Sequence, residues 1–315
     1  MSQMFESIMK TPEKLEKVLE KENELKRIAE KIKGGTIFFA GSGSAYNAAC
    51  YGKRCFERIG LLTEVKTYLD FVNSPLVRPG TVTIVISVSG AKDAPRIAKY
   101  AKSRGSYVVA ITNTENSPLL QHCDDYFIVP SGVGDSFINT KEHVCQLFSL
   151  LILSYLISGK NIAELSKVPE FAKQVIEKNK ERIDGMIEKY KNMEHFVFLS
   201  KGANMILAEQ STMKLREVCW RLKHVEALSV DELPHGRLFS LGDSETIFFL
   251  LTDSVPEYFE NIKTNVEHFK IEDDLLPPIT HQQIFYLFTE SLCKHYSIDP
   301  DNPRNVEIVK KILNK

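Results

Sequence analysis

The stretch FFAGSGSAYNAA at residues 38–49 combines an apolar run, a turn of small residues and the beginning of a helix. The stretch VFLSKGANMILA repeats this order in the second half of the chain, at residues 197–208. Each reads as a buried strand that turns directly into a helix. Because the two copies lie about half a chain apart, they predict two domains of one kind rather than a solenoid of short repeats.

Apolar runs of strand length continue around the first copy. They cover residues 36–40, 82–88, 107–112 and 126–129, and segments of helical character such as residues 91–103 separate them. Near-continuous apolar strands that alternate with helices are typical of a parallel sheet covered on both faces. The predicted fold class is therefore α/β, with three-layer αβα domains built on parallel sheets.

The second half is expected to be the smaller domain. Its run at residues 246–252 corresponds to residues 82–88 of the first half, but less chain follows it. We therefore expect the second sheet to lack one strand–helix unit.

Two polar helical segments flank the first domain. Residues 12–33 are rich in Lys and Glu with one narrow apolar stripe, which predicts a helix on its own domain or one that also packs on a second subunit. The expected division is a helical segment at 1–33, a first domain at 34–165, a helical connector at 166–192, and a second domain with a C-terminal tail at 193–315.

Composition limits the classes of partner. The chain has 315 residues, of which 43% are hydrophobic and 26% charged, and its formal net charge is -1. This balance fits a globular protein and gives no overall field that would attract nucleic acid or an anionic membrane. The chain shows neither a signal-peptide pattern nor an apolar stretch of bilayer length, so we expect a cytoplasmic protein.

No metal or organic cofactor is expected. The six cysteines are scattered, and none forms a CxxC pair or stands at metal-ligand spacing from a histidine.

Two turns of small residues could bind an anion. GSGS at residues 41–44 and SVSG at residues 87–90 each follow an apolar strand and precede a helix, and Lys92 lies in the next turn. Serine hydroxyls and free amides at a helix start bind phosphate, and glycine lets the backbone approach it closely. Since both turns follow strands of one parallel sheet, they are expected at the same edge, where such sheets bind ligands.

These motifs resemble a known family. GSGSAYN at residues 41–47, SVSG and NTKEHVCQL at residues 139–147 resemble the three signatures of the sugar isomerase (SIS) domain. The second half resembles the isomerase part of glucosamine-6-phosphate synthase and its stand-alone relatives, the sugar-phosphate deaminases and the fructosamine-6-phosphate deglycases. The motifs that carry this second resemblance are LAEQSTMKLRE at 207–217, DELPHG at 231–236 and DPDNPRN at 299–305.

The resemblance implies a phosphate site in the first half. Side chains of both turns would hold the phosphate, namely Ser44, Ser87, Ser89 and Lys92. Gly43 and Asn139 fall on family positions that line the sugar. The family usually has threonine at the position of Lys92 and glutamine at that of Val88, but a lysine can bind phosphate as a point charge.

The resemblance also implies a catalytic base in the second half. Glu217 matches the carboxylate that moves a proton between C1 and C2 of the opened sugar, and Lys214 lies one turn before it on the same helix face. The alternative is an ordinary Lys–Glu pair on a helix surface.

The motif at residues 231–236 implies a second proton-transfer group. His235 matches the histidine that relatives use to open the sugar ring, often from a neighbouring subunit, and Glu232 belongs to the same motif. Arg237 stands where relatives usually carry proline, so the loop could fit a different substrate.

The C-terminal motif departs from the family. Synthases carry a lysine three residues after Pro-Arg-Asn that forms a Schiff base with the ketose, whereas this chain has Ile308 there. The nearest amines are Lys310 and Lys311. Either the tail is shifted in register, with Lys310 as the candidate amine, or the enzyme works without an imine.

The motifs together predict an enzyme of phosphorylated amino sugars. The chain begins Met-Ser-Gln without a glutamine-hydrolysing part, so a deaminase or isomerase that converts glucosamine-6-phosphate to fructose-6-phosphate and ammonia is expected rather than a synthase. A fructosamine-6-phosphate-type deglycase is the close alternative, and a sugar-phosphate sensor without turnover is the alternative of another class. The expected partners are a small sugar phosphate and a second copy of the chain in a homodimer.

Overall fold

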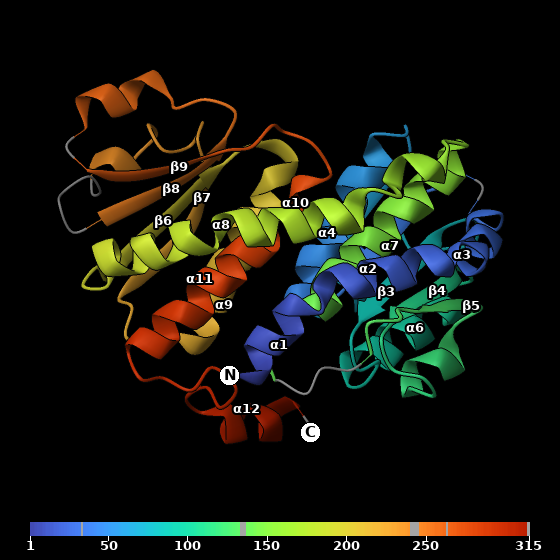
Figure 1. The fold of residues 1–315 in the computed structure, drawn as a ribbon. Coiled ribbons are helices and arrows are strands. Elements are labelled where there is room, and N and C mark those ends of the chain that lie inside the picture. Colours follow the sequence, from blue (N-terminus) through green and yellow to red (C-terminus); the bar gives the residue numbers. More distant parts are fainter. Residues whose placement is uncertain (33, 133–136, 240–245, 263, 314–315) are drawn as a thin grey trace. The chain divides into compact units, whose positions relative to one another are not determined.

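The computed structural model describes residues 1–32, 34–132, 137–239, 246–262 and 264–313. These fall into two compact units (Figure 1). We call Met9–Glu170 with Glu307–Lys315 the N-terminal unit, and Met1–Ile8 with Phe171–Val306 the C-terminal unit. The predicted four-part division of the chain stays a prediction, and its first boundary, at residue 33, lies outside the described residues.

A five-stranded parallel sheet forms the centre of the N-terminal unit. Its strand order is β2-β1-β3-β4-β5, and every neighbouring pair is parallel. The strands are β1 (Ile37–Ala40), β2 (Thr63–Lys66), β3 (Val82–Ser87), β4 (Tyr107–Thr112) and β5 (Asp125–Ile128).

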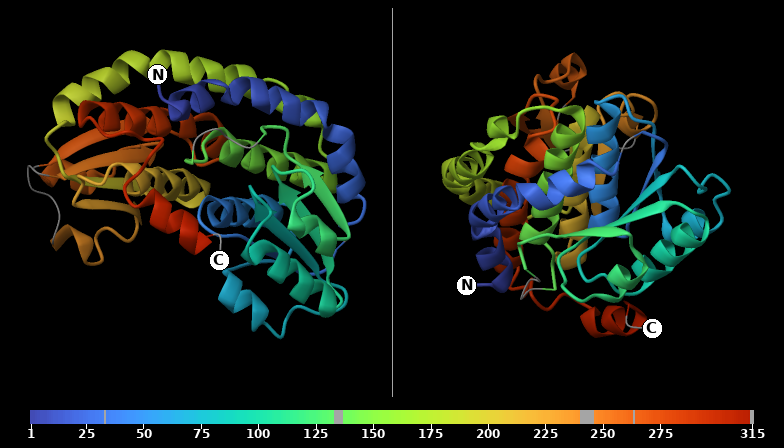
Figure 2. Two further views of the ribbon diagram at one scale, coloured as in Figure 1. Left: turned by 90° about the horizontal axis from the view of Figure 1, so that it is seen from below. Right: turned by 90° about the vertical axis from the view of Figure 1, so that its right-hand side faces the viewer.

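Helices cover both faces of this sheet, as the two views of Figure 2 show. One face carries α4 (Ser44–Glu57) and α7 (Lys141–Ser158), and the other carries the two helices α5 (Tyr68–Val72) and α6 (Asp93–Ser103). The segment predicted as one helix over residues 12–33 forms two, α2 (Thr11–Glu20) and α3 (Glu22–Ala29), which pack on α7 and separate at Lys21.

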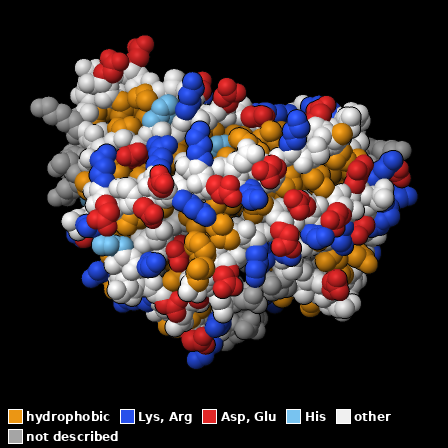
Figure 3. Space-filling model, in the orientation of Figure 1, with side chains coloured by type: hydrophobic (Ala, Val, Ile, Leu, Met, Phe, Trp, Pro, Cys, Tyr) orange, Lys and Arg blue, Asp and Glu red, His pale blue; other side chains and the backbone are white. Residues whose placement is uncertain are grey.

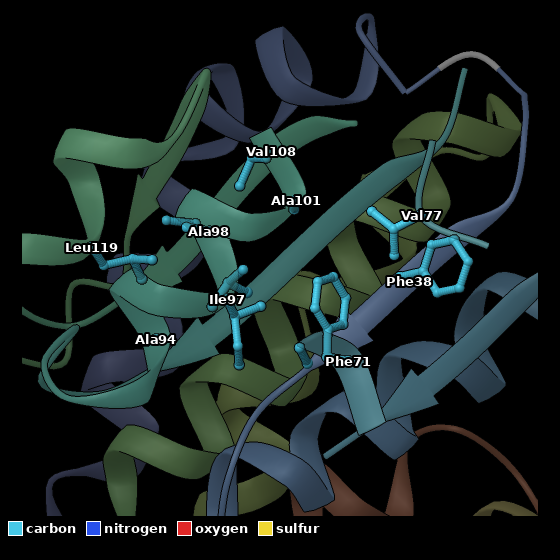
Figure 4. Close-up of a cluster of buried hydrophobic side chains, with 12 residues drawn as sticks. Phe38, Phe71, Val77, Ala94, Ile97, Ala98, Ala101, Val108 and Leu119 are labelled. Carbon is cyan, nitrogen blue, oxygen red and sulfur yellow. The ribbon is translucent and has the colours of Figure 1, made fainter. Parts of the chain in front are cut away.

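Alternating strand residues build the two halves of this core. Phe38 points toward α5 and α6, and its ring meets that of Phe71 edge to face at 6.3 Å between centroids. Val85, Ile97 and further buried side chains complete this cluster (Figure 4). Phe39 points to the opposite face and meets Phe56 of α4 at 5.1 Å. Because both faces are buried, the central strands are apolar throughout.

The C-terminal unit contains a four-stranded parallel sheet with the order β7-β6-β8-β9. It pairs β6 with β7 and β8, and β8 with β9, in parallel. The strands are β6 (His195–Ser200), β7 (His224–Ser229), β8 (Thr246–Thr252) and β9 (Asn265–Lys270). The predicted fold class, α/β with two parallel sheets, is confirmed, and the second sheet is described with one strand fewer than the first.

Long helices cover one face of this second sheet. α9 (Met205–Val218) follows β6 through the short helix η3 (Gly202–Asn204), and it packs on α11 (Gln282–His295), which follows α10 (Pro277–Thr280). Phe198 and Phe249 lie beneath α11, where Phe285 meets them at 5.5 and 6.4 Å.

The other face of the second sheet has a thinner cover. Between β8 and β9 the described residues, 253–262 and 264, form the short helix η5 (Glu257–Asn261), where the N-terminal unit has α6. Phe259 of η5 packs on Phe248, with their ring centroids 5.3 Å apart, and the buried Leu233 joins the same cluster.

Three further helices lie near the ends of the units. α1 (Gln3–Met9) is tied to the C-terminal unit, because the amides of Gln3 and Met4 donate to Asp301. α8 (Val168–Tyr190) begins at the end of the N-terminal unit and continues into the C-terminal one, and α12 (Val306–Leu313) falls almost entirely in the N-terminal unit.

Charges of both signs are interspersed over the face shown in Figure 3. Within the described parts of the chain, no helix is both long and apolar enough to cross a lipid bilayer.

Candidate functional site

In the N-terminal unit the strand order changes direction between β1 and β3, and we call this place the switch point of the sheet. These strands are neighbours, and β2 lies on the outer side of β1 while β4 lies beyond β3. The helices that follow them, α4 and α6, cover opposite faces of the sheet. Open α/β sheets bind ligands at such a point, outside the carboxyl ends of the strands. Both candidate anion-binding turns lie there.

The turn after β1 is shaped by two glycines. A Cβ atom at Gly41 would approach the carbonyl group of Ala45 to 2.5 Å, so only glycine lets the first turn of α4 come this close. Gly43 is the N-cap of α4 with φ 59° and ψ -128°, and Ser44 is the first helical residue. The amides of Ala45, Tyr46 and Asn47 already donate to the carbonyl oxygens of Ser42 and Gly43, so Ser44 itself is the candidate anion donor of this turn.

Hydrogen bonds from β4 and the residues after it fix the turn after β3. The carbonyl oxygen of Val88 accepts from the hydroxyls of Thr112 and Thr114 at 3.2 and 2.9 Å, and from the amide of Asn113 at 3.1 Å. The Ser87 hydroxyl accepts from the amide of Gly90 at 3.1 Å. This anchoring holds the turn in one conformation, which favours a prearranged ligand site.

Lys92 adopts a backbone conformation that is rare for a residue with a side chain. It is the N-cap of α6 with φ 62° and ψ -114°, close to the values of Gly43 in the other turn. Such conformations cost about 1–3 kcal/mol in a non-glycine residue and cluster at functional sites. Partial burial lowers the pKa of Lys92, and the neighbouring Asp93 opposes this shift. Among the residues that the structure describes, no carboxylate pairs with the Lys92 ammonium.

Asn139 precedes the first turn of α7, where its side chain is half-buried. Next to it the structure contains a buried polar network that the sequence reasoning missed. His143 and Gln146 of α7 bond Asn47 of α4 and Asn113 after β4, at 2.9 and 2.8 Å. The available signal was a pair of polar residues three positions apart in an otherwise apolar helix.

The predicted base and its lysine are brought together on α9. The Nζ atom of Lys214 lies 2.7 Å from Oε2 of Glu217. Only 2% of the Lys214 side chain is exposed, against 37% for Glu217. The pair is thus anchored by a buried ammonium, and the carboxylate stays open to an incoming molecule. A simple helix-surface pair would leave both side chains in solvent.

Glu232 and His235 lie together in the turn after β7. The amide of His235 donates to the carbonyl oxygen of Glu232 at 3.0 Å, and both side chains are exposed. The buried Leu233 between them anchors the turn in the core. Arg237, at the start of the short helix η4 (Arg237–Phe239), pairs with Glu226 of β7 at 2.7 Å.

Lys310 lies on α12 and already has a partner. Its Nζ atom is 2.8 Å from Oε1 of Glu307 one turn earlier, and this bond lowers the pKa of Glu307. Ile308, at the position of the family lysine, is 58% exposed. Within the described portions of the chain, no group of three or more His, Cys, Asp or Glu side chains could hold a metal ion.

The corresponding point of the second sheet, between β6 and β8, is filled by the chain itself. The amide of Ala203 donates to Oδ1 of Asp273 at 2.9 Å, and Lys201 pairs with Asp253 at 2.7 Å. The bond from Lys201 lowers the pKa of Asp253. The two units therefore share a plan, but at the switch point of the second sheet the described carboxylates Asp253 and Asp273 already pair with donors of the chain itself.

The sheet order defines a doubly wound α/β protein with a candidate anion site at one edge of its first sheet. Residues 32–154, within the N-terminal unit, match the family profile described as SIS domain, so this part of the chain is a SIS domain. This confirms the resemblance that the motifs indicated.

Relatives match over most of the chain. It is 30% identical over 268 residues to a glutamine–fructose-6-phosphate aminotransferase [isomerizing] of Caldanaerobacter subterraneus subsp. tengcongensis, covering 80% of this chain and 43% of that protein. It is 27% identical over 292 residues to the protein of the same name in Methanocaldococcus jannaschii, covering 89% and 26%. The chain thus spans less than half the length of either relative.

Solved structures show the same fold. The C-terminal domain of glucosamine-fructose-6-phosphate aminotransferase from Francisella tularensis matches with a TM-score of 0.82 at 20% identity, over 96% of this chain and 98% of that one. A glucosamine-6-phosphate deaminase from Thermotoga maritima matches with a TM-score of 0.82 at 21% identity, over the same shares.

Proposed function

We propose that the chain is a sugar-phosphate isomerase that acts on a phosphorylated amino sugar. The observation that carries the proposal is the switch point of the N-terminal sheet, where the turns after β1 and β3 bring the hydroxyl groups of Ser44, Ser87 and Ser89 and the Lys92 ammonium to one edge. This donor set suits a phosphate group. The names of the relatives and of the Thermotoga maritima structure supply the substrate class, because those proteins are named for fructose-6-phosphate and glucosamine-6-phosphate.

Each phosphate-binding residue has a distinct role in this proposal. Ser44, Ser87 and Ser89 donate their hydroxyl hydrogens to phosphate oxygens, and the Lys92 ammonium adds a positive charge. Gly43 leaves room beside the first turn, since a Cβ atom there would meet nothing within 4 Å. Asn139 offers an amide to a sugar hydroxyl.

Glu217 is proposed as the base of the isomerisation. His235, with Glu232 beside it, gives a proton to the ring oxygen as the sugar opens, and Glu217 then takes the proton from C2 and returns it at C1. The Lys214 ammonium steadies the negative charge that develops on oxygen between these steps. When the sugar carries an amino group at C2, this proton transfer gives an imine at C2. Water hydrolyses the imine, which gives the ketose and ammonia.

Deamination of glucosamine-6-phosphate is the first form of this reaction that we propose. The substrate carries its own nitrogen, so the steps need no amine from the protein. This agrees with Ile308 at the position of the family lysine and with Lys310 held by Glu307 at 2.8 Å. A deglycase that releases an amine from a fructosamine-6-phosphate, or a sensor without turnover, would bind the same phosphate.

The assay that tests the proposal measures ammonia, amine and ketose release over a panel of phosphorylated amino sugars and fructosamines. We expect turnover of glucosamine-6-phosphate and a fall in kcat of about 100-fold or more for Glu217→Gln, with binding retained. Glu209→Gln, on an exposed position of the same helix, is the matched control. Binding without any turnover would identify a sensor, and amine release alone a deglycase.

We also propose a homodimer with shared sites. The support is the exposed position of His235 in a turn that relatives of this family donate across subunits. Mixing Glu217→Gln chains with His235→Ala chains should then restore part of the activity. In verified mixed dimers, activity that stays at the level of the single variants would place both residues in one subunit's site.

A further inference from the structure

A cavity lies in the C-terminal unit, and none of the residues that line it is proposed for the isomerase site. Its volume is ≈ 350 Å³, near the lower end of the roughly 300–1,000 Å³ found for ligand pockets. It opens where one stripe of α8 faces the end of β9 and the beginning of α11. Six of its lining residues carry the argument, namely Phe171, Lys178, Arg182, Phe269, Lys270 and His281.

The charged lining of this cavity is cationic. Lys178 and Lys270 make no ion pair with any carboxylate that the structure describes, and no described Asp or Glu is among the lining residues. Arg182 is held in place, because it donates to the carbonyl oxygen of His268 at 2.9 Å and lies 3.3 Å from Glu267. Two unpaired ammonium groups beside a fixed guanidinium would attract an anion.

The same cavity offers flat surfaces. The Arg182 guanidinium lies 3.8 Å from the ring centroid of Phe269, so its plane is fixed over a buried ring. Phe171 is 47% exposed and meets the His281 ring edge to face at 6.0 Å. Exposed aromatic rings and fixed guanidinium planes are surfaces on which planar ligand groups stack.

His281 belongs to these rings rather than to the cations. Burial lowers its pKa to about 4, so the imidazole is neutral near pH 7. Its Nδ1 atom lies 2.9 Å from the hydroxyl of Thr280, which fixes the orientation of the ring. The part of the lining that His281 shares with Phe171 is therefore uncharged, whereas the part formed by Lys178 and Lys270 is cationic.

We propose that this cavity binds an organic phosphate with a planar ring, of the size of a nucleoside monophosphate, at a site separate from the isomerase site. The phosphate contacts Lys178 and Lys270, beside the fixed Arg182 guanidinium, and the ring stacks on the exposed ring of Phe171. Neither half of this ligand alone uses both surfaces, so an ion without a ring and a ring without a phosphate bind more weakly.

The test uses calorimetry on the full chain carrying Ser87→Ala and Ser89→Ala, so that binding at the isomerase site does not contribute. The probes are adenosine 5′-monophosphate, ribose 5-phosphate, adenosine and inorganic phosphate. We expect the monophosphate to bind best, and its Kd to rise about tenfold or more when Lys178→Ala and Lys270→Ala are added. Lys173→Ala with Lys180→Ala removes two charges from exposed positions of the same helix that do not line the cavity, and should leave the Kd unchanged.

Three results would overturn the proposal. The first is no binding of adenosine 5′-monophosphate up to about 10 mM, which is weaker than a specific small-molecule site. The second is an equal rise of the Kd in the control variant, which would show that the effect comes from the overall charge of the protein and not from this cavity. The third is equal binding of inorganic phosphate or of adenosine, which would show that one of the two surfaces is unused. Phe171→Ala, a substitution at an exposed position, should weaken the monophosphate but not inorganic phosphate.

Discussion

The turns after β1 and β6 share a backbone plan but differ in what occupies the space before their helices. A Cβ atom at Gly43, after β1, would meet no atom within 4 Å. At Gly202, which holds the corresponding position after β6, the same atom would collide with the carboxylate of Asp273. The two glycines have nearly the same φ, 59° and 56°. The difference therefore comes from a side chain that is distant in sequence, not from the turn itself.

The neighbouring turns differ in the same sense. After β3 the chain offers the hydroxyls of Ser87 and Ser89, whereas after β8 it offers Asp253, paired with Lys201 at 2.7 Å. In the C-terminal unit the chain's own carboxylates meet the donors that an outside anion would use. A repeated fold can thus keep its strand–turn–helix geometry in both copies and reserve ligand binding for one of them.

The largest expected effect tests the open switch point directly. Ser87→Ala combined with Ser89→Ala should weaken binding of a phosphosugar by about 4 kcal/mol, or about a thousandfold in Kd, because two hydrogen bonds to a charged group are lost. Binding of the same sugar without phosphate should change little. Calorimetry with both ligands measures the two losses side by side.

The matched control lies in the filled unit. Ser254→Ala removes a hydroxyl from the turn after β8 and should leave phosphosugar binding unchanged. If Ser254→Ala weakens binding as much as the double variant, or if the double variant weakens both ligands equally, the assignment of the open and the filled switch points is wrong.

The second effect concerns acid stability and should come from the C-terminal unit. Burial lowers the pKa of His281 to about 4, below the value of about 6.5 for an unfolded chain. Since the unfolded state takes up the proton more readily, this stability is present above pH 6.5 and is lost as the pH falls toward 4. The loss between pH 7.5 and 4.5 is about 2.5 kcal/mol.

Urea unfolding at the two pH values measures this loss. His281→Phe keeps a ring beside Phe171 and should lose about 2.5 kcal/mol less than the unmodified chain on acidification. His295→Gln, at an exposed position, should behave like the unmodified chain. Parallel acid profiles for all three proteins would mean that His281 is protonated in the folded state as easily as in the unfolded one.

The sequence predicted the central strands because they are buried on both faces and therefore apolar throughout. The strands that it missed are β2, β7 and β9, and all three lie at sheet edges. The burial pattern of β2 is that of a half-exposed strand, and its sequence TEVK carries no apolar run. Edge strands need less apolar surface, so their signal is weak at the level of sequence.

The parts of the candidate site that are contiguous in sequence could be predicted, and the contacts between distant residues could not. Strand, small-residue turn and helix are adjacent in sequence, so both phosphate turns could be recognised. The bond between His143 and Asn47 joins residues 96 positions apart, and that between Ala203 and Asp273 joins residues 70 positions apart. Contacts of this kind depend on the complete fold, so no local sequence pattern predicts them.

A smaller effect separates strain from charge at Lys92. Lys92→Gly should stabilise the N-terminal unit by about 1.5 kcal/mol, because glycine adopts φ 62° without steric cost. Lys92→Ala keeps the strain, and both variants lose the charge and should bind phosphosugar more weakly. Urea unfolding and calorimetry on both variants would reveal the opposite case, in which Lys92→Gly is no more stable than Lys92→Ala and the conformation carries no strain.

The smallest effect tests the filled switch point. Asp273→Ala should destabilise the C-terminal unit by about 1 kcal/mol, the usual cost of losing a carboxylate cap at a helix start, because the Ala203 amide loses its acceptor. Glu272→Ala removes the same charge from an exposed neighbouring side chain and is the control. Urea unfolding compares the two.

Phosphate then decides what the Asp273 carboxylate does. If it occupies the place of an anion, inorganic phosphate should stabilise Asp273→Ala more than it stabilises Glu272→Ala, because the vacated amide of Ala203 can bind the ion. The chain with Asp273 intact should respond like the control, since its own carboxylate already accepts from that amide. Equal responses of all three proteins would show that the turn after β6 has no affinity for anions. The two units would then differ in the turns themselves and not in what fills them.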